Sequence, residues 1–148
     1  MVTLRNDPYG NFNFLVDLGT GDTDGPAAGF TQVDGLGLEV TYAEYRNGNE
    51  KGNRVRKIPG LYRVPNVILR RGVIGSTDLF EWLQRVSEGT AEPRTVRIHL
   101  LDQSREVVGS WSLQRSQPAR WSGPSLDARG SDVAIEELVL VCEGIDYE

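Results

Sequence analysis

The sequence has very few of the residues on which most catalytic and metal sites depend. Among its 148 residues there is one histidine, His99, and one cysteine, Cys142. With one histidine, on a predicted strand, we expect neither a multi-histidine metal site nor a histidine-dependent triad in one chain. One cysteine excludes an intrachain disulfide. We expect His99 to be a half-exposed strand residue and Cys142 to be a buried structural thiol.

Long apolar runs are also missing. The longest, Leu138 to Cys142, has five residues, whereas a membrane-spanning helix needs roughly 20. The N-terminal residues contain no apolar core of signal-peptide length. We therefore expect synthesis in the cytosol and no membrane insertion. The net charge of −5 at pH 7 also argues against nucleic-acid binding by bulk charge.

Nucleotide and calcium motifs are incomplete. Gly19 and Gly21 begin a dinucleotide fingerprint, but the third glycine falls one place late, at Gly25, and no helical pattern follows. Asp22 and Asp24 resemble the start of a calcium loop whose final glutamate is absent. We interpret this segment as a surface turn. The neighbours Glu136 and Glu137 point to opposite faces of a strand. The sequence thus predicts no enzyme, no cofactor and no metal.

Alternating apolar and polar residues are the main positive signal. Such stretches are typical of β-strands with one buried face, and the high glycine content, 17 residues, indicates many turns. The predicted strands are Phe12–Asp17, Phe30–Val33, Leu38–Ala43, Asn66–Arg70, Val96–Leu101, Val107–Gln114 and Val133–Glu143, with a hairpin turn at Asp102–Glu106. We predict one mainly β (α+β) domain over residues 1–148, with two packed β-sheets in a sandwich or open barrel and one α-helix.

One segment has helical spacing. Leu79, Trp82, Leu83 and Val86 fall at i, i+3, i+4 and i+7 and form one apolar stripe. Asp78 with Glu81 has the spacing of a capping box, and Gly89 stands where a helix usually ends. The pattern predicts a helix over about residues 77–88 that packs on a sheet. With these four apolar residues we expect Trp111 in the core.

Charge is unevenly distributed along the chain. Seven basic residues and no acidic one lie between positions 51 and 71: Lys51, Arg54, Arg56, Lys57, Arg63, Arg70 and Arg71. Six acidic residues and no basic one follow Arg129: Asp132, Glu136, Glu137, Glu143, Asp146 and Glu148. Either these are two solvated faces, or the basic face of one copy meets the acidic face of the next in a head-to-tail contact. A third interpretation is that the 51–71 stretch contacts nucleic-acid phosphates.

Several segments, in order and over nearly the whole chain, resemble the tail-tube family of contractile phage tails and phage-derived extracellular injection systems. They are Asp7–Tyr9 with Asn11–Phe14, Gly29–Leu36, Glu44–Gly48, Arg56–Leu61, Asn66–Gly72, Trp121–Pro124, Val133–Leu138 and Cys142–Gly144. The resemblance implies two packed β-sheets plus a helix. It also implies hexameric rings stacked head to tail around a lumen that conducts DNA or protein effectors.

The resemblance further implies which residues and partners take part in assembly. The family's long loop after the third strand reaches an adjacent ring, and here it corresponds to about Arg46–Lys57. The contact residues that we predict in this loop are Arg46, Asn47, Lys51, Arg54 and Arg56. A contractile sheath protein, baseplate and spike proteins and a cargo in the lumen are the implied partners. A ring of tube initiator or adaptor next to the baseplate is the alternative within the same machine, and a small nucleic-acid-binding β-domain is the alternative of another class.

Overall fold

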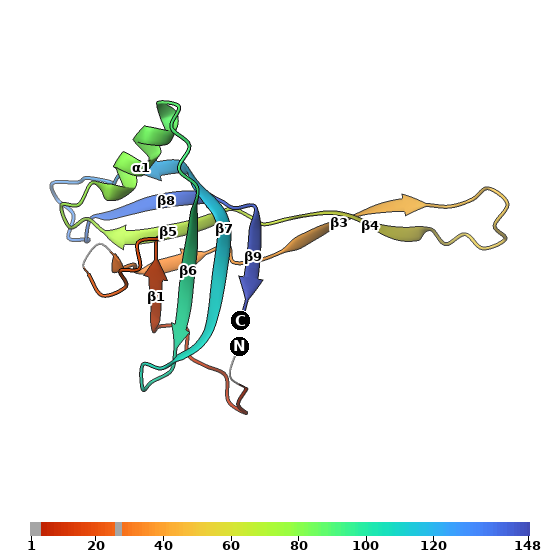
Figure 1. Ribbon diagram of the computed structural model, residues 1–148, viewed down its shortest axis with the longest axis horizontal. Helices are drawn as coiled ribbons and strands as arrows, with labels where there is room; N and C mark the ends of the chain where they lie inside the picture. The colour runs from red at the N-terminus through yellow and green to blue at the C-terminus, as the bar shows by residue number, and fades with distance from the viewer. Residues whose placement is uncertain (1–3, 26–27) are drawn as a thin grey trace.

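The computed structural model describes residues 4–25 and 28–148 and shows a β-rich body from which one long hairpin projects (Figure 1). In the described residues the elements are β1 (Phe14–Asp17), β2 (Gln32–Asp34), β3 (Glu39–Tyr45), β4 (Arg56–Arg63), β5 (Val67–Gly72), α1 (Asp78–Ser87), β6 (Arg94–Leu101), β7 (Val107–Ser122), β8 (Ile135–Val141) and β9 (Gly144–Tyr147). The predicted fold class, mainly β with one helix, is confirmed.

The two packed sheets are two halves of one continuous antiparallel sheet. Its strand order is β1-β6-β7-β8-β5-β2, and β9 also pairs with β7. The first part of β7 pairs with β6 and β9, and its last part, from Gln117 to Ser122, pairs with β8. The long strand β7 therefore belongs to both halves, and the sheet folds over along it. Strands β3 and β4 form a separate two-stranded sheet.

The bend in β7 lies at a short irregular segment. Arg115 has a positive φ of 50°, and the pairing register shifts between Pro118 and Arg120. Bulges of this kind let one strand turn a corner and switch sheets. The predicted strand ended at Gln114, and this boundary was wrong because the irregular residues bend the strand without ending it.

Two further strand predictions were wrong. No strand was predicted over β4. Pro59 and Gly60 lie within it, and proline is confined to sheet edges. In a two-stranded sheet both strands are edges, so Pro59 is tolerated there. The single strand predicted over Val133–Glu143 is shorter, since β8 ends at Val141 and the chain then turns to form β9 on another side of β7.

Helix α1 closes one end of the folded sheet and supplies its largest buried side chain. Trp82 is fully buried and Leu79 is 2% exposed. Val86 and Trp111 are partly buried against this core, whereas Leu83 is half-buried and lies outside the buried cluster. The indole nitrogen of Trp82 donates to the carbonyl oxygen of Glu92 at 3.0 Å, which satisfies its one polar group.

The two helix ends behave differently from each other. The predicted capping box between Asp78 and Glu81 was wrong: the N-cap residue is Thr77, and no side chain caps the helix. The Asp78 carboxylate instead accepts hydrogen bonds from Arg71. At the other end the prediction holds, because Gly89 has a φ of +97° and its N–H donates to the carbonyl oxygen of Val86, as in a Schellman motif.

Candidate functional site: the projecting arm

The hairpin formed by β3, β4 and their connection, residues 39–63, is called the arm. Every residue of both strands is exposed, and the arm extends well beyond the body (Figure 1). Seven residues of β3 at about 3.4 Å each span roughly 24 Å, so the tip lies far from the core. No part of the body covers either face of the arm.

The root of the arm is fixed by a close backbone approach. Gly35 follows β2 and has a φ of +93°, and a Cβ atom at this position would lie 2.1 Å from the carbonyl oxygen of Asn66. Only glycine fits such a contact. On the returning side Val64 is buried, so the arm leaves a firmly packed part of the body.

Large apolar side chains on the arm have no cover within the chain. Tyr42 is 60% exposed, Leu61 84% and Ile58 47%. A two-stranded hairpin is marginally stable by itself, and contiguous exposed apolar surface usually marks a contact with another molecule. The sequence prediction named only polar residues of this region; the alternation around Tyr42 was visible, but it was interpreted as one face of a body strand.

Three of the five predicted contact residues hold the tip of the arm together. Arg46 donates to the carbonyl oxygens of Gly52 at 3.0 Å and Glu50 at 2.7 Å. The backbone N–H of Asn47 donates to the Glu50 carboxylate, with which Arg56 forms an ion pair at 2.8 Å. These residues therefore shape the turn, and their side chains are already engaged within one chain.

The other two predicted contact residues, Lys51 and Arg54, are exposed. Neither forms an ion pair with any residue in the part of the chain that the structure describes. They place two positive charges at the tip, at the point farthest from the body. Of the five residues, these two are the ones available to a partner.

The basic stretch of the sequence is not a basic face in the structure. Five of its seven cations pair within the chain: Arg56 with Glu50, Lys57 with Glu44, Arg63 with Glu39, Arg70 with Asp34 and Glu137, and Arg71 with Asp78 and Glu136. These pairs leave fewer unpaired cations for a neighbouring copy, because the fold brings acid and base together inside one chain. The meeting of a basic and an acidic face of two copies stays a prediction. The nucleic-acid interpretation loses its continuous positive surface for the same reason.

One of these ion pairs is buried and ties α1 to the sheet. Arg71 is fully buried, and its Nε donates to Glu136 at 2.7 Å while Nη1 donates to Asp78 at 3.2 Å. Burial by itself raises the pKa of the Asp78 carboxyl, but hydrogen bonds from Arg71 and Ser76 and the charge of Arg71 outweigh it, so the pKa lies below its ordinary value. Trp121 also donates to Glu136. The cluster thus joins β5, β7, β8 and α1.

The opposite face of the same strands carries a second ionic cluster. Glu137 accepts hydrogen bonds from Arg120 at 2.8 Å and from Arg70 at 2.9 Å, and Arg70 also pairs with Asp34. The hydrogen bond from Arg120, followed by that from Arg70 and both positive charges, holds the pKa of Glu137 below its ordinary value. Glu136 and Glu137 therefore lie on opposite faces, as the sequence predicted.

The residues considered for chemistry have structural contacts. Asp17 accepts the backbone N–H groups of Gly19 and Gly21, and Asp22 accepts those of Asp24 and Gly25. This segment is a turn closed by its own side chains. Within residues 4–25 and 28–148, no three potential metal ligands lie together, and α1 is too short and too polar to cross a bilayer.

The one histidine and the one cysteine lie in different settings: His99 is on β6, as predicted, whereas Cys142 lies between β8 and β9 and is half-buried, so the strand position and the full burial predicted for it were wrong. His99 is half-buried and its Nδ1 lies 2.7 Å from the hydroxyl of Ser110 on the neighbouring strand. Burial raises the pKa of the Cys142 thiol, which lies 3.3 Å from the hydroxyl of Ser116. A raised pKa disfavours the reactive thiolate.

Comparison with solved structures finds chains of similar fold in contractile injection systems. A chain from the sheath–tube complex of an extracellular contractile injection system, PVC, in its extended state is 27% identical, with a TM-score of 0.84 over 95% of this chain and 91% of that one. A chain from the anti-feeding prophage cap (AFP tube terminating cap) is 26% identical, with a TM-score of 0.86 and coverage of 99% and 94%. One from the AFP baseplate is 25% identical, with a TM-score of 0.84 and 97% coverage of both chains.

A search of curated proteins gave no match. The family model of the T4-like virus tail tube protein gp19, however, matches residues 10–146. This range contains both halves of the folded sheet, helix α1 and the entire arm. The chain therefore belongs to the T4-like tail tube protein family and is a structural tube subunit.

Proposed function

We propose that this chain, as one tail-tube domain over residues 1–148, forms hexameric rings that stack head to tail into the inner tube of a contractile injection particle. The role is structural and requires no catalysis. Family membership supports it, together with the likeness to chains from contractile injection systems. The observation that carries the stacking proposal is the arm, which exposes apolar residues such as Tyr42 and Leu61 that only another chain can cover.

The lumen is proposed to face the polar side of the sheet half made of β1, β6, β7 and β9. Direct pairing places Arg97 beside Ser112, His99 beside Ser110, and Ser112 beside Asp146 on this side. The other side carries core residues such as Ile98 and Trp111. Leu15 pairs with His99 and also lies on this side, but the other side chains named here are polar or charged. Such a surface suits a channel, because a passing cargo gains little by binding to it.

Lateral contacts within a ring are proposed to use the two open edges of the same half. Strands β1 and β9 each have one neighbour, β6 and β7 respectively, and so each exposes unpaired backbone groups. Edge-to-edge pairing of one copy's β1 with the next copy's β9 would satisfy these groups and continue the sheet around the ring. This removes the exposed edges that otherwise favour aggregation.

The proposed partners follow from the relatives. The similar chains come from a sheath–tube complex and from a baseplate, so we propose a contractile sheath protein outside the tube and baseplate and spike proteins at its end. Synthesis in the cytosol and assembly there into a phage-tail-like particle fit this role. The lumen would hold the cargo of the particle.

A second candidate is a ring present once, at an end of the tube. Similar chains also come from a tube terminating cap and a baseplate, which are the ends of such particles. Subunit stoichiometry in the intact particle distinguishes the two candidates: many copies indicate the main tube, and six copies indicate an initiator or adaptor.

The proposed function is tested by negative-stain electron microscopy of the purified protein, with its mass in solution measured in parallel. Six-fold rings or tubes are the expected result. A strict monomer at high concentration would contradict self-assembly. A salt-dependent DNA-binding assay on that monomer would then test the nucleic-acid alternative, which predicts binding that weakens steeply with salt.

A further inference from the structure

The tip of the arm carries an asparagine followed by a glycine, Asn47 and Gly48, and no other asparagine of the chain precedes a glycine. The side-chain carbonyl carbon of asparagine, Cγ, is an electrophile, and the backbone nitrogen of the next residue can reach it by closing a small ring. Glycine favours this attack, because it has no Cβ to hinder the approach and adopts a wide range of backbone angles. At this pair the chain can therefore react with itself.

The backbone nitrogen of Gly48 is available for such an attack. Its N–H has no hydrogen-bond acceptor within the described residues, and the turn is closed by a different donor, the N–H of Glu50, which bonds the carbonyl oxygen of Asn47 at 3.2 Å. A Cβ atom placed on Gly48 would have no neighbour within 4 Å. Gly48 is also exposed, so water reaches it.

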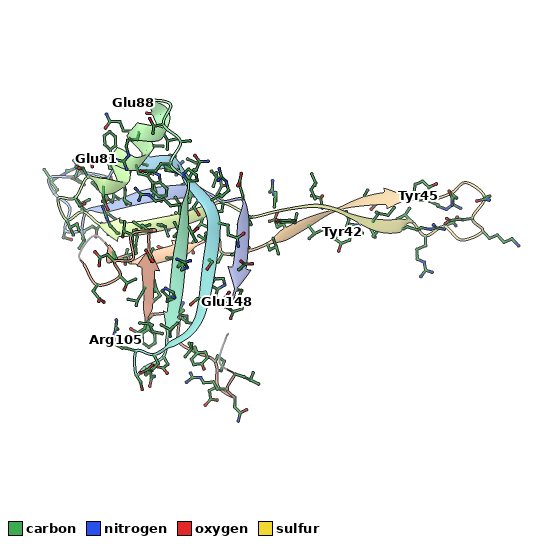
Figure 2. All side chains as sticks on the ribbon, in the orientation of Figure 1. Tyr42, Tyr45, Glu81, Glu88, Arg105 and Glu148 are labelled. Carbon is green, nitrogen blue, oxygen red and sulfur yellow. The ribbon has the colours of Figure 1, made fainter. Side chains whose placement is uncertain are left out.

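The side-chain amide of Asn47 is polarised by a neighbour. The hydroxyl of Tyr45 donates a hydrogen bond to Oδ1 of Asn47, while Nδ2, the group that would leave, has no partner in the described part of the chain. Attack on Cγ places negative charge on Oδ1, and a donor already directed at that oxygen stabilises this charge. Tyr45 ends β3, and Figure 2 shows it near the outer end of the arm, away from the body.

Contacts around the turn keep this arrangement in place. Arg46 donates to the carbonyl oxygens of Glu50 and Gly52, and the N–H of Asn47 donates to the Glu50 carboxylate at 3.4 Å. Asn47 is half-buried as a result. Its amide is thus held beside the Tyr45 hydroxyl instead of moving freely in solvent, which lowers the entropic cost of reaction.

We propose that Asn47 is a self-modification site, at which the backbone nitrogen of Gly48 displaces ammonia from the side-chain amide while Tyr45 donates a hydrogen bond to the reacting carbonyl. The bond from this nitrogen to Cγ forms, the bond from Cγ to Nδ2 breaks, and the proton of the Gly48 N–H passes through solvent to the departing ammonia. The product is a cyclic imide.

Water then opens the imide in one of two ways. If water breaks the bond from the nitrogen to Cγ, residue 47 becomes aspartate. If it breaks the bond to the backbone carbonyl carbon, the main chain runs through Cγ and the residue becomes isoaspartate. Neither route needs an oxidant, a reductant or another protein.

Either product changes the tip of the arm. A carboxylate replaces a neutral amide next to Lys51 and Arg54, the two cations without an ion pair in the described residues, and isoaspartate also adds an atom to the backbone of the turn. The next consequence rests on the proposed function. A subunit that stays free for long loses the tip geometry and charge with which it joins a tube, so the site limits how long a free subunit can assemble.

The test follows the mass of the tip while the purified chain is incubated. Peptides are analysed by mass spectrometry for the exchange of NH for O at Asn47, and a sample digested at time zero is the control. The matched internal controls are Asn49 and Asn53, exposed asparagines of the same tip that no glycine follows. We expect conversion at Asn47 alone. An unchanged Asn47, or equal conversion at Asn49, would overturn the proposal.

Two variants test the roles of the neighbouring residues. Tyr45→Phe keeps the ring and removes the hydroxyl, and we expect conversion to slow by about three- to tenfold, the rate equivalent of one hydrogen bond. Gly48→Ala fits the open space of the turn but hinders the attack, so conversion should be lost on this time scale. An unchanged rate in Tyr45→Phe would overturn the role of its hydroxyl, and an unchanged rate in Gly48→Ala would overturn the attack by this nitrogen.

Electron micrographs of fresh and incubated protein test the effect on assembly. We expect tubes from the fresh parent chain, few or none from the converted parent, and tubes from incubated Gly48→Ala. Equal tubes from fresh and converted parent would overturn the limit on assembly. Absence of tubes from the fresh parent would overturn the proposed function instead, while the mass spectra would still decide the chemistry at Asn47.

Discussion

The body and the arm are both antiparallel β-structure, yet their side chains have different surroundings. In the body, β5 and β8 alternate so that Leu69 and Leu138 meet in the core while Arg70 and Glu137 meet outside. In the arm, both faces of β3 and β4 are exposed. Burial of apolar area stabilises the body by about 25 cal/mol per Å², and the arm receives almost none of this within one chain.

The comparison separates residues that stabilise the single chain from residues that are free to contact other chains. Residues of the body serve the stability of the single chain, and residues of the arm serve contacts that exist only in the tube. Substitutions in the two regions should therefore separate two measurements, the free energy of unfolding of the monomer and the formation of tubes. The predictions below test this separation, from the largest expected loss of stability to the smallest.

The largest loss is expected from Trp82→Ala in the core. Removing a fully buried indole leaves a cavity and an unpartnered carbonyl at Glu92, which should lower the free energy of unfolding by about 3–5 kcal/mol. Urea denaturation followed by fluorescence measures it. The control is Tyr42→Ala on the arm, for which we expect no more than about 0.5 kcal/mol. An unchanged melting temperature for Trp82→Ala would contradict the packing of α1.

A loss of similar size is expected when the buried ion cluster is broken. Arg71→Ala leaves Glu136 buried without its cation, and removing one member of a buried pair typically costs about 3–5 kcal/mol. The matched control is Lys57→Ala on the arm, whose pair with Glu44 is solvent-exposed and should contribute about 0–1 kcal/mol. If urea denaturation showed that the two substitutions lower the free energy of unfolding equally, the proposed difference between body and arm would be contradicted.

Acid should destabilise the body gradually. The pKa values of Asp78 and Glu137 are lowered in the folded chain, so the unfolded chain binds more protons in acid. The stability that these carboxylates contribute is fully present above their unfolded pKa of about 4 and is lost as pH falls through their lower folded pKa. We expect the urea midpoint to fall on acidification below about pH 4.5. Asp78→Asn with Glu137→Gln should flatten this dependence; an unchanged slope would contradict it.

The smallest effect on stability and the largest on assembly should come from the tip of the arm. Reversing charge at Lys51 and Arg54, to glutamate, removes no contact within the described chain and should change the free energy of unfolding by less than about 0.5 kcal/mol. Tubes should nevertheless be lost or shortened in electron micrographs. Arg46→Ala is the contrasting variant, because it breaks the tip itself. Normal tubes from the double reversal would show that the tip does not mediate stacking.

Local features of the chain could be predicted from the sequence because their causes are local. The period of three to four residues around Trp82 defines a helix face, and Gly89 ends that helix because it adopts a positive φ. Alternation of apolar residues predicted most body strands. The order of motifs identified the family.

Other features depend on distant parts of the chain and could not be predicted in this way. Strand β4 was not predicted, and its Pro59 is acceptable because a two-stranded sheet leaves that strand a free edge. Strand β7 was predicted too short because the irregular residues after Gln114 look like the end of a strand. The cations of residues 51–71 form an unbroken basic stretch in the sequence. In the fold, strand pairing places Glu44 beside Lys57 and Glu136 beside Arg71.

The sequence by itself determined the family, the helix and most strands, since each follows from the identity of residues and their spacing. Only the tertiary structure decided which charges are neutralised, where the sheet folds and which apolar residues are left uncovered. Tyr42 on the arm and Val67 in the body both follow a strand pattern, but one is 60% exposed and the other fully buried. The reason is physical: exposure depends on what packs against a strand, and a strand's own residues do not contain that information.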